Sequence, residues 1–367
     1  LLAVNKYKVW LTINKKALKH NIDVFRKLIG LKTELWSVVK SNAYGHGLVV
    51  FAQLADNLGV DGFCVDSVVE GSTLREAGIK KPILVLGPTL SHLYSLAKKL
   101  DITVTISNEE ALNDLMKLRT ENRPCFHLKI DTGMHRQGFY VKDLKTIIEN
   151  CKLKIENLLV GVYSHFASAK DTNYTTFNEL QFSEFKKAIT ILEKDGFKKL
   201  KKHIAATAGT LIDKKYHLDL VRVGIGLYGL WPSRELEIQL GEKISLKTAL
   251  SWHALISEIK EVRKGDYIGY DLTERVGQNT KVAIVPIGYW HGLPRDLSSV
   301  GEIFIGGKSV RILGRVSMDL ITIDATGVNC KIGDKVDIVP MSIAQKLGVS
   351  HYEVITRINP LIKKIVQ

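Results

Sequence analysis

The sequence of 367 residues predicts an α/β fold, an N-terminal (β/α)8 TIM-like barrel followed by a C-terminal all-β domain. The first observation is that eight apolar runs of strand length alternate with segments of helical period, which is the strand count of such a barrel. An open, doubly wound sheet is the alternative, but regular units of this number favour closure. The second observation is a change of pattern after Trp231-Pro232, where short β runs divided by glycine-rich turns begin and indicate an all-β domain.

Each predicted barrel strand is a short apolar run, and amphipathic segments such as Phe177 to Glu193 separate most of them. In order these strands are 35–39, 61–66, 82–86, 102–106, 125–130, 158–163, 202–206 and 220–225. The predicted strands of the second domain are 248–261, 281–287, 302–305, 309–313, 320–323 and 335–339, with the opening run 7–13 expected beside them. We therefore expect a barrel over residues 12–240 and a β domain formed by residues 1–11 and 241–367.

Composition and charge limit the classes of function. The net charge is +14, but the sequence has no basic stripe with interleaved aromatic residues, so nucleic-acid binding is not predicted. No apolar run is long enough to span a membrane, and the start lacks a signal peptide. The first residue is not Met, which is compatible with a membrane anchor outside this fragment, and a basic surface suits a domain near an anionic membrane.

Cysteine usage predicts a cytoplasmic location and no metal site. The four cysteines show neither paired nor metal-ligand spacing, and we expect them to be reduced and mostly buried; they are Cys64, Cys125, Cys151 and Cys330.

Lys40 is the first candidate for chemistry. It ends an apolar run that reads as a buried strand, and a turn of small and polar residues follows it. Burial lowers the pKa of an ammonium group, and a neutral amine can form a Schiff base with an aldehyde. The cofactor that uses such a lysine is pyridoxal 5'-phosphate (PLP). The plain alternative is a lysine whose stem packs at the strand end while its charge reaches water.

Other polar candidates follow the ends of the predicted strands. In a (β/α)8 barrel the active site forms at the C-terminal ends of the strands. Residues without a function would scatter over both ends of the barrel, so convergence on one mouth is the stronger argument. Besides Lys40, the candidates at these ends are Lys129, Asp131, Arg136, His165, Thr207, Arg222 and Gly224.

Seven segments in order along the chain resemble the alanine racemases, which are fold-type III PLP enzymes. One is Lys-Ile-Asp-Thr-Gly-Met-His-Arg-Gln-Gly at 129–138, and the others are 38–47, 163–167, 221–229, 268–270, 286–289 and 314–319. Any one segment alone would be a weak signal, whereas seven in order make a strong one. The resemblance covers essentially the full length and implies an isomerase that interconverts L- and D-amino acids with PLP as its cofactor.

The resemblance implies a mechanism with two acid–base groups. Lys40 is similar to the Schiff-base lysine of the family, and Tyr270 to the catalytic tyrosine that comes from the other subunit. A homodimer with shared active sites is therefore implied. Arg222 matches the arginine facing the pyridine nitrogen of the cofactor; since a guanidinium stays protonated, that nitrogen should remain unprotonated, which favours racemisation over transamination. His165 and Arg222 are implied to link to Tyr270 through hydrogen bonds.

The remaining site residues are also implied by the resemblance. Phosphate binding is implied for Tyr44, Thr207, Gly224 and Ile225, the last two through backbone N–H groups. His165 is implied to pack on the cofactor ring, and Arg136 to contact the substrate carboxylate, oriented by Lys129, which is carbamylated in some members. The implied residues of the substrate pocket are Tyr289 and Met318, with Met318 coming from the partner subunit.

Two departures from the family pattern bear on function. Ala206 stands where many members have an asparagine, which puts one polar contact near the phosphate in doubt. Asn359 lies at or next to a position that is aromatic or bulky in several members. Because a site that bonds a hydroxyl discriminates strongly, Asn359 favours serine over alanine as the substrate. With this departure the chain resembles the cytoplasmic racemase domains of membrane-bound serine racemases tied to vancomycin resistance. The prediction is a serine and alanine racemase that supplies D-amino acids for cell-wall precursors, in glycopeptide resistance.

Three other readings stay open from the sequence. The first is an ordinary alanine racemase, in which Asn359 reflects drift of the tail. The second is a fold-type III amino-acid decarboxylase, which shares the two domains but lacks the segment 314–319. The third is a PLP-binding carrier made of the barrel alone, against which the second domain and Tyr270 argue.

Overall fold

The computed structural model describes residues 6–171 and 175–367, with the backbone alone for residues 150–154. The chain forms two compact units, and each is described by itself. The β unit contains the described residues up to Lys15, the short segment Tyr44–Gly47 and the segment Ala249–Gln367. The barrel unit contains Lys16–Ala43 and Leu48–Thr248.

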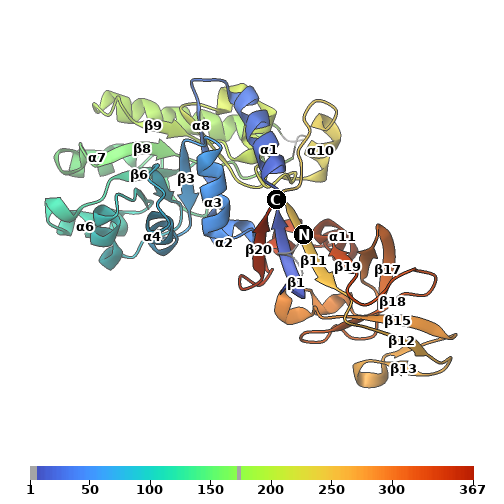
Figure 1. Cartoon of the computed structure of the whole chain (residues 1–367). Coiled ribbons are helices and arrows are strands. Elements are labelled where there is room, and N and C mark those ends of the chain that lie inside the picture. The colour runs from blue at the N-terminus through green and yellow to red at the C-terminus, as the bar shows by residue number, and fades with distance from the viewer. Residues whose placement is uncertain (1–5, 172–174) are drawn as a thin grey trace. The chain divides into compact units, whose positions relative to one another are not determined.

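Eight parallel strands build the barrel unit (Figure 1). Two sheets, in the orders β10-β2-β3-β4 and β5-β6-β8-β9, are joined by bridges from Leu84 to Thr103 and from Ala206 to Arg222. The sheet therefore closes, and the predicted (β/α)8 fold is confirmed. The strands are β2 (Glu34–Val38), β3 (Gly62–Val65), β4 (Ile83–Val85), β5 (Val104–Ile106), β6 (Phe126–Asp131), β8 (Leu159–Tyr163), β9 (Lys201–His203) and β10 (Leu220–Val223), with β7 (Phe139–Tyr140) beside β6.

Helices of the barrel unit bury one apolar face against the strands. In α1 (Lys15–Ile29), Leu18, Ile22 and Phe25 are buried at helical spacing. Side-chain caps begin several helices, for example Ser67 before α4 (Val68–Glu76). The remaining helices are α2 (Lys40–Tyr44), α3 (Leu48–Asn57), α5 (Tyr94–Lys99), α6 (Glu109–Lys117), α7 (Leu144–Ile155), α8 (Thr175–Lys194), α9 (Thr207–Ile212) and α10 (Arg234–Leu240).

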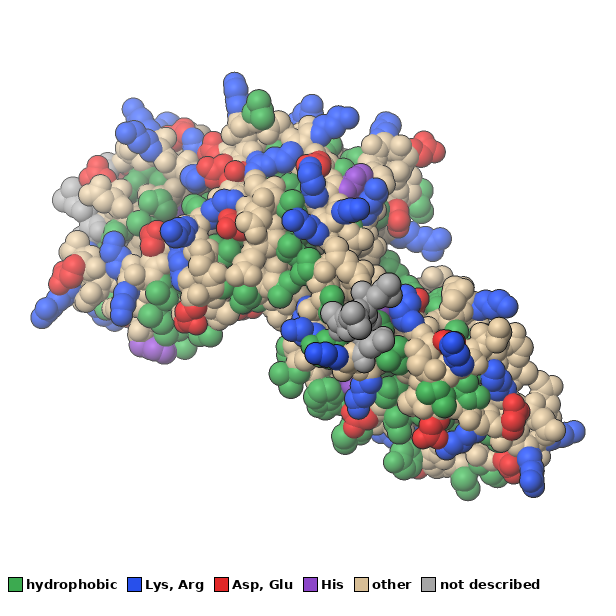
Figure 2. Space-filling model, viewed as in Figure 1, with side chains coloured by type: hydrophobic (Ala, Val, Ile, Leu, Met, Phe, Trp, Pro, Cys, Tyr) green, Lys and Arg blue, Asp and Glu red, His purple; other side chains and the backbone are tan. Residues whose placement is uncertain are grey.

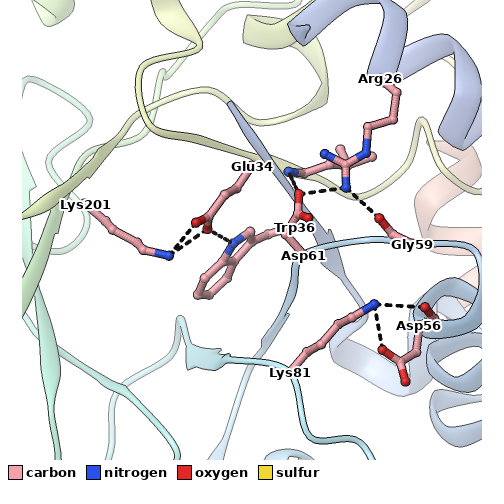
Figure 3. Close-up of polar contacts among 9 residues, drawn as sticks. Arg26, Glu34, Trp36, Asp56, Gly59, Asp61, Lys81 and Lys201 are labelled. Carbon is pink, nitrogen blue, oxygen red and sulfur yellow. Dashed lines mark hydrogen bonds and ion pairs between the residues drawn. The ribbon is translucent and has the colours of Figure 1, made fainter. Parts of the chain in front are cut away.

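Charged side chains close the N-terminal end of the barrel (Figure 3). Glu34 begins β2 and Lys201 begins β9, and the ammonium Nζ lies 2.7 Å from both carboxylate oxygens of Glu34. Trp36 donates its indole N–H to the same carboxylate at 2.8 Å. Because active sites of such barrels form at the opposite end, these contacts serve stability and leave the other mouth for chemistry.

A curved nine-stranded sheet makes up most of the β unit, and the predicted C-terminal β domain is confirmed. Its order is β12-β15-β18-β17-β16-β19-β11-β1-β20. The strands are β1 (Val9–Ile13), β11 (Leu250–Leu255), β12 (Glu258–Val262), β15 (Thr280–Val285), β16 (Glu302–Ile305), β17 (Lys308–Leu313), β18 (Ile321–Asp324), β19 (Lys335–Ile338) and β20 (Lys363–Val366). The hairpin β13 (Tyr267–Ile268) and β14 (Glu274–Arg275) and two helices, α11 (Pro340–Leu347) and α12 (His351–Thr356), complete it.

The distribution of surface charge and the state of the cysteines agree with what the composition predicts. Figure 2 shows lysine and arginine side chains spread over the viewed face and interspersed with acidic ones. Among residues with described side chains, Cys64, Cys125 and Cys330 are free thiols, and Cys151 lies outside them. Within the described ranges, no helix is long and apolar enough to cross a membrane.

Candidate active site

Lys40 lies at the C-terminal mouth of the barrel. Strand β2 ends at Val38, and Lys40 begins the next turn, α2. Its side chain is 38% exposed, and the ammonium Nζ lies 3.7 Å from Oδ1 of Asp66, which follows β3. The expectation that Lys40 is the last residue of the strand and buried is therefore wrong, because the chain leaves the sheet before it and the partly exposed amine lies beside a carboxylate.

The turn after Lys40 is left-handed. Ser41, Asn42, Ala43 and Tyr44 all have φ between 50° and 56°, a conformation that costs roughly 1–2 kcal/mol per residue outside glycine. Surrounding contacts hold it in place. Glu70 accepts the N–H of Ser41 at 2.7 Å through one carboxylate oxygen and the N–H of Asp66 at 2.8 Å through the other. Strain that is held this firmly beside a reactive amine is typical of functional sites.

Tyr44 ends this turn and belongs to the β unit. Its ring centroid lies 6.0 Å from that of Tyr352 on α12. Gly45 follows, and an added Cβ there would come within 2.0 Å of the carbonyl oxygen of Ile355. Within the β unit, position 45 therefore needs a glycine, both for this close backbone contact and for its positive φ.

Arg222 lies on β10 and is 2% exposed. Its guanidinium donates to the carbonyl oxygens of Ser164 at 2.8 Å and Ile204 at 3.1 Å. It also donates to Nδ1 of His203 and, at 3.3 Å, contacts Nδ1 of His165. Because an arginine side chain only donates hydrogen bonds, these partners fix its orientation toward the mouth of the barrel.

Positive charge accumulates around His165. Burial lowers the pKa of His165 well below its usual value, and the cations Lys129, Arg222, Arg136 and Lys40 lower it further. Burial also lowers the pKa of Lys129, with Arg222 and Arg136 acting in the same direction. The ammonium of Lys129 lies 4.4 Å from the ring centroid of Tyr163. A neutral imidazole among cations is suited to stack on a ligand that carries negative charge.

The loop that presents Arg136 is organised by Asp131. One carboxylate oxygen accepts the N–H groups of Gly133, Met134 and His135 at 2.9–3.1 Å, and the other accepts the N–H of Arg136 at 3.1 Å. Burial acts to raise the pKa of Asp131, but these backbone N–H groups outweigh it and hold the pKa below its usual value. Asp131 therefore stays ionised, and its negative charge is directed at the loop backbone.

Thr207 lies against the turn that follows β10. Its hydroxyl oxygen accepts the N–H groups of Gly224 at 3.2 Å and Gly226 at 3.4 Å. A hydroxyl that accepts in this way keeps its own proton to donate. Ile225 lies in the same turn and is buried. Glycine is required at Gly226, because an added Cβ would approach the ring of Phe25 to 2.4 Å.

The other predicted site residues lie together on loops of the β unit. Tyr270 is 68% exposed and Met318 is 53% exposed. The N–H groups of Tyr289 and Trp290 both donate, at 3.0 Å, to carbonyl oxygens of Ser317 and Met318. Asp271, next to Tyr270, forms an ion pair with Arg315 at 3.3 Å. Three loops of this unit therefore meet at Tyr270, Tyr289 and Met318.

Asn359 bonds the backbone with both ends of its side chain. Its amide donates to the carbonyl oxygen of Trp290 at 2.9 Å, and its own oxygen accepts the N–H of Leu361 at 2.9 Å. These contacts attach the C-terminal tail to the loop of Tyr289. The role of Asn359 in bonding a substrate hydroxyl, which the sequence suggested, gains no support from this geometry.

Comparison with known proteins identifies the family. A family model described as the N-terminal domain of alanine racemase matches residues 13–232, and one described as its C-terminal domain matches 249–366. The chain belongs to the alanine racemase family. An alanine racemase of Leptospira interrogans is 34% identical, over 98% of this chain and 96% of the relative. One of Caldanaerobacter subterraneus is 36% identical, over 95% and 92%.

Solved structures agree with this assignment. The alanine racemase of Bacillus anthracis, with bound L-Ala-P, has a TM-score of 0.91 and 32% identity, covering 98% of this chain and 95% of that one. That of E. faecalis has a TM-score of 0.90 and 31% identity, covering 99% of each chain.

The chain is therefore an enzyme, an amino-acid racemase, and the family matches extend over both domains. The family matches therefore do not favour the two other interpretations of the sequence, an amino-acid decarboxylase and a PLP-binding carrier made of the barrel alone. The serine-leaning prediction is also not what the relatives support, because those reported above are alanine racemases; the ordinary alanine racemase alternative fits better.

Several residues of the site were not predicted. His127 and His203 lie behind Arg222, and Asp66 and Glu70 lie beside Lys40. A signal for one was present: His127, Lys129 and Asp131 alternate along the strand, so all three point to the same face of the sheet. The contacts of Glu70 depend on the left-handed turn, which no sequence pattern predicts.

Proposed function

We propose that this chain is a PLP-dependent alanine racemase that acts as a homodimer with shared active sites. The observation that supports this most is the joint position of Lys40, Lys129, Arg136 and Arg222 around His165 at the barrel mouth. Two guanidinium groups and two lysine amines, of which Lys40 is partly exposed, suit a small anionic aldehyde and an amino-acid carboxylate.

The residues present fit PLP. Of the nearby carboxylates, Asp131 is engaged by four backbone N–H groups, so the pocket keeps an excess of positive charge for a phosphate. Tyr44, the Thr207 hydroxyl and the N–H of Ile225 would hold the phosphate beside Gly224, whose N–H donates to Thr207 in this structure. Lys40 would hold the aldehyde carbon, His165 the ring face and Arg222 the ring nitrogen. PLP, when bound, supplies an electron sink that acidifies the α-proton of an attached amino acid.

Racemisation requires two groups of the chain on opposite faces of the substrate. The amine of Lys40 would exchange the α-proton of the D-enantiomer, and the phenol of Tyr270 that of the L-enantiomer. A phenol is a poor base in water, and nearby cations make it a better one. Arg136 would bind the substrate carboxylate and be oriented by Lys129, and Tyr289 and Met318 would border the substrate side chain.

The exposure of Tyr270 supports the proposed dimer. A base that exchanges a substrate proton needs a site that excludes water, yet Tyr270 is 68% exposed in the β unit. We propose that Tyr270 and Met318 complete the site of the partner subunit, where cations at the barrel mouth would face the phenol. An assembly of this kind is symmetric, so each dimer would hold two sites.

An assay of both enantiomers tests the proposal. The purified protein loaded with PLP is expected to convert L-alanine to D-alanine, and the reverse, until the two are equal. Lys40→Ala should lower kcat by at least about a thousandfold. In deuterium oxide, Tyr270→Phe should slow α-proton exchange of L-alanine more than that of D-alanine. Release of carbon dioxide, or PLP binding without exchange of either α-proton, would overturn the proposal.

Alanine is the proposed substrate, and serine is the alternative that the sequence raised. Comparing kcat/KM for L-alanine and L-serine in the wild type decides between them. Asn359→Tyr then tests the tail: we expect an unchanged serine-to-alanine ratio, because Asn359 bonds Trp290 and Leu361. A ratio that falls tenfold or more would restore Asn359 as the determinant. A supply role for cell-wall precursors, a place in glycopeptide resistance and a membrane anchor stay predictions from the sequence.

A further inference from the structure

A chain of buried polar side chains extends from Arg222 away from the mouth of the barrel. Arg222 donates to Nδ1 of His203, and Nε2 of His203 lies 2.8 Å from Nδ1 of His127. His127 and His203 are both buried in the barrel interior. The proposed mechanism uses neither histidine, although both lie within two contacts of its central arginine.

The proton positions in this chain follow from Arg222. A guanidinium cannot accept a hydrogen bond, so Nδ1 of His203 carries no proton. Burial lowers the pKa of His203 well below its usual value, and burial lowers that of His127 to about 3, so both rings are neutral near pH 7. A neutral His203 then has its proton on Nε2 and donates it to Nδ1 of His127. His127 must in turn be bare at Nδ1.

The surroundings of His127 are built to hold this ring. On the neighbouring strand β8, Gly161 leaves room for it, because an added Cβ would lie 2.5 Å from Nε2 of His127. Tyr163, two residues further along, stacks on His203 with ring centroids 4.8 Å apart and planes 3° apart. The Tyr163 hydroxyl bonds Thr105 at 2.9 Å, whose own proton goes to the carbonyl oxygen of Val85 at 2.7 Å. The rings therefore have fixed positions as well as fixed protons.

We propose that His127 is a positioning residue that fixes the tautomer of His203 and, through it, the orientation of Arg222. This inference rests on the proposed function, in which Arg222 faces the cofactor ring nitrogen. Without an acceptor at position 127, His203 can move its proton to Nδ1. That proton would then face an N–H of Arg222, and the guanidinium would lose a partner. Holding a histidine tautomer by a partner behind it is a known use of buried polar groups.

The test compares two substitutions of His127, one that keeps a hydrogen-bond acceptor at the position of Nδ1 and one that removes it. His127→Asn keeps an acceptor, since the amide oxygen can occupy the place of Nδ1, whereas His127→Phe keeps the ring and removes the acceptor. The first readout is nitrogen-15 NMR of histidine in the protein without PLP. We expect the Nε2-protonated tautomer of His203 in the wild type and in His127→Asn, and its loss in His127→Phe.

The second readout is kinetic, in the loaded enzyme. His127→Phe should lower kcat for alanine by about tenfold or more and leave KM within about twofold, and His127→Asn should restore most of kcat. His253→Phe is the matched control: His253 is also buried, and it bonds Asp337 at 2.6 Å in the β unit. It should not change the tautomer of His203.

Two results would overturn the inference. One is an unchanged His203 tautomer in His127→Phe, whatever the kinetics. The other is a His127→Asn variant as impaired as His127→Phe, which would assign the effect to packing. Failure of the proposed function is a separate outcome, seen as a wild type that does not racemise alanine, and the NMR readout without PLP still decides the role of His127.

Discussion

His127 links the stability of the protein to pH. Burial lowers its pKa from 6.5 to about 3, so below pH 6.5 the unfolded chain binds a proton that the native state refuses. The contribution of this group is therefore fully present above pH 6.5 and is lost as pH drops toward 3, by about 1.4 kcal/mol per pH unit. In urea unfolding of the protein without PLP, the free energy of unfolding should fall less between pH 7 and 5 in His127→Asn than in the wild type. The reason is that unfolding of the variant takes up about one proton fewer. Equal pH dependence of the free energy of unfolding in the wild type and the variant would contradict this prediction.

Asp131 supports a second prediction, about the loop that carries Arg136. Asp131→Ala removes an acceptor that serves four N–H groups, so we expect a loss of about 2 kcal/mol in the free energy of unfolding and a raised KM for alanine. Asp131→Asn keeps one acceptor oxygen, so its free energy of unfolding and its KM should lie between those of the wild type and Asp131→Ala. Since the native pKa of Asp131 is depressed, its contribution is present above about pH 4 and is lost as pH falls through the native pKa.

The control for Asp131 lies a few residues further along the chain. Asp143 precedes α7, is exposed and makes no side-chain cap. Asp143→Asn should therefore change stability by less than about 0.5 kcal/mol and leave KM unchanged. If it raised KM as Asp131→Asn does, loss of a negative charge, and not loss of the N–H contacts, would explain the effect.

At the scale of elements, the left-handed turn 41–44 depends on Glu70. Its carboxylate bonds the N–H groups of Ser41 and Asp66, which join the ends of β2 and β3. Glu70→Ala should destabilise the protein by about 1–3 kcal/mol and weaken PLP binding, because the strained turn that follows Lys40 loses an anchor. Glu70→Gln should have a smaller effect, since one oxygen remains to accept.

Glu76, on the same helix α4, provides the comparison. It is exposed, and its carboxylate accepts only the Ser72 hydroxyl among the hydrogen bonds described for it. Glu76→Gln should leave the melting temperature and PLP affinity near the wild-type values, measured by thermal unfolding and by cofactor titration. A Glu70→Ala variant that matches Glu76→Gln in both would show that other contacts hold the turn.

Elements differ in how far their sequence predicts them. The barrel strands were predictable because apolar runs repeat with helices between them. The left-handed turn was not, because Ser41, Ala43 and Tyr44 give no local preference for positive φ. The helix α11 had signals that were missed, a proline at its start and Gly348 with positive φ at its end. Strand β20 contains two lysines and depends on pairing with β1, so its pattern alone was weak.

At the scale of the whole molecule, the candidate site falls into two groups that the sequence predicts in different ways. Lys40, Lys129 and Arg222 lie at one end of a closed barrel, so topology alone brings them together. Tyr270 and Met318 lie on loops of the β unit, and no periodicity could assign them to that site. Their role came from resemblance to the family, and it makes the dimer the feature most in need of a direct test.

A heterodimer with one damaged group in each subunit supplies that test. One subunit carries Lys40→Ala and keeps Tyr270, and the other carries Tyr270→Phe and keeps Lys40. If Tyr270 acts in the partner's site, one site combines both intact groups and the other has neither. The purified heterodimer should then show about half of the wild-type kcat per dimer, while each parent homodimer is nearly inactive. If Tyr270 acts within its own subunit, each site lacks one group, and the heterodimer stays as inactive as its parents.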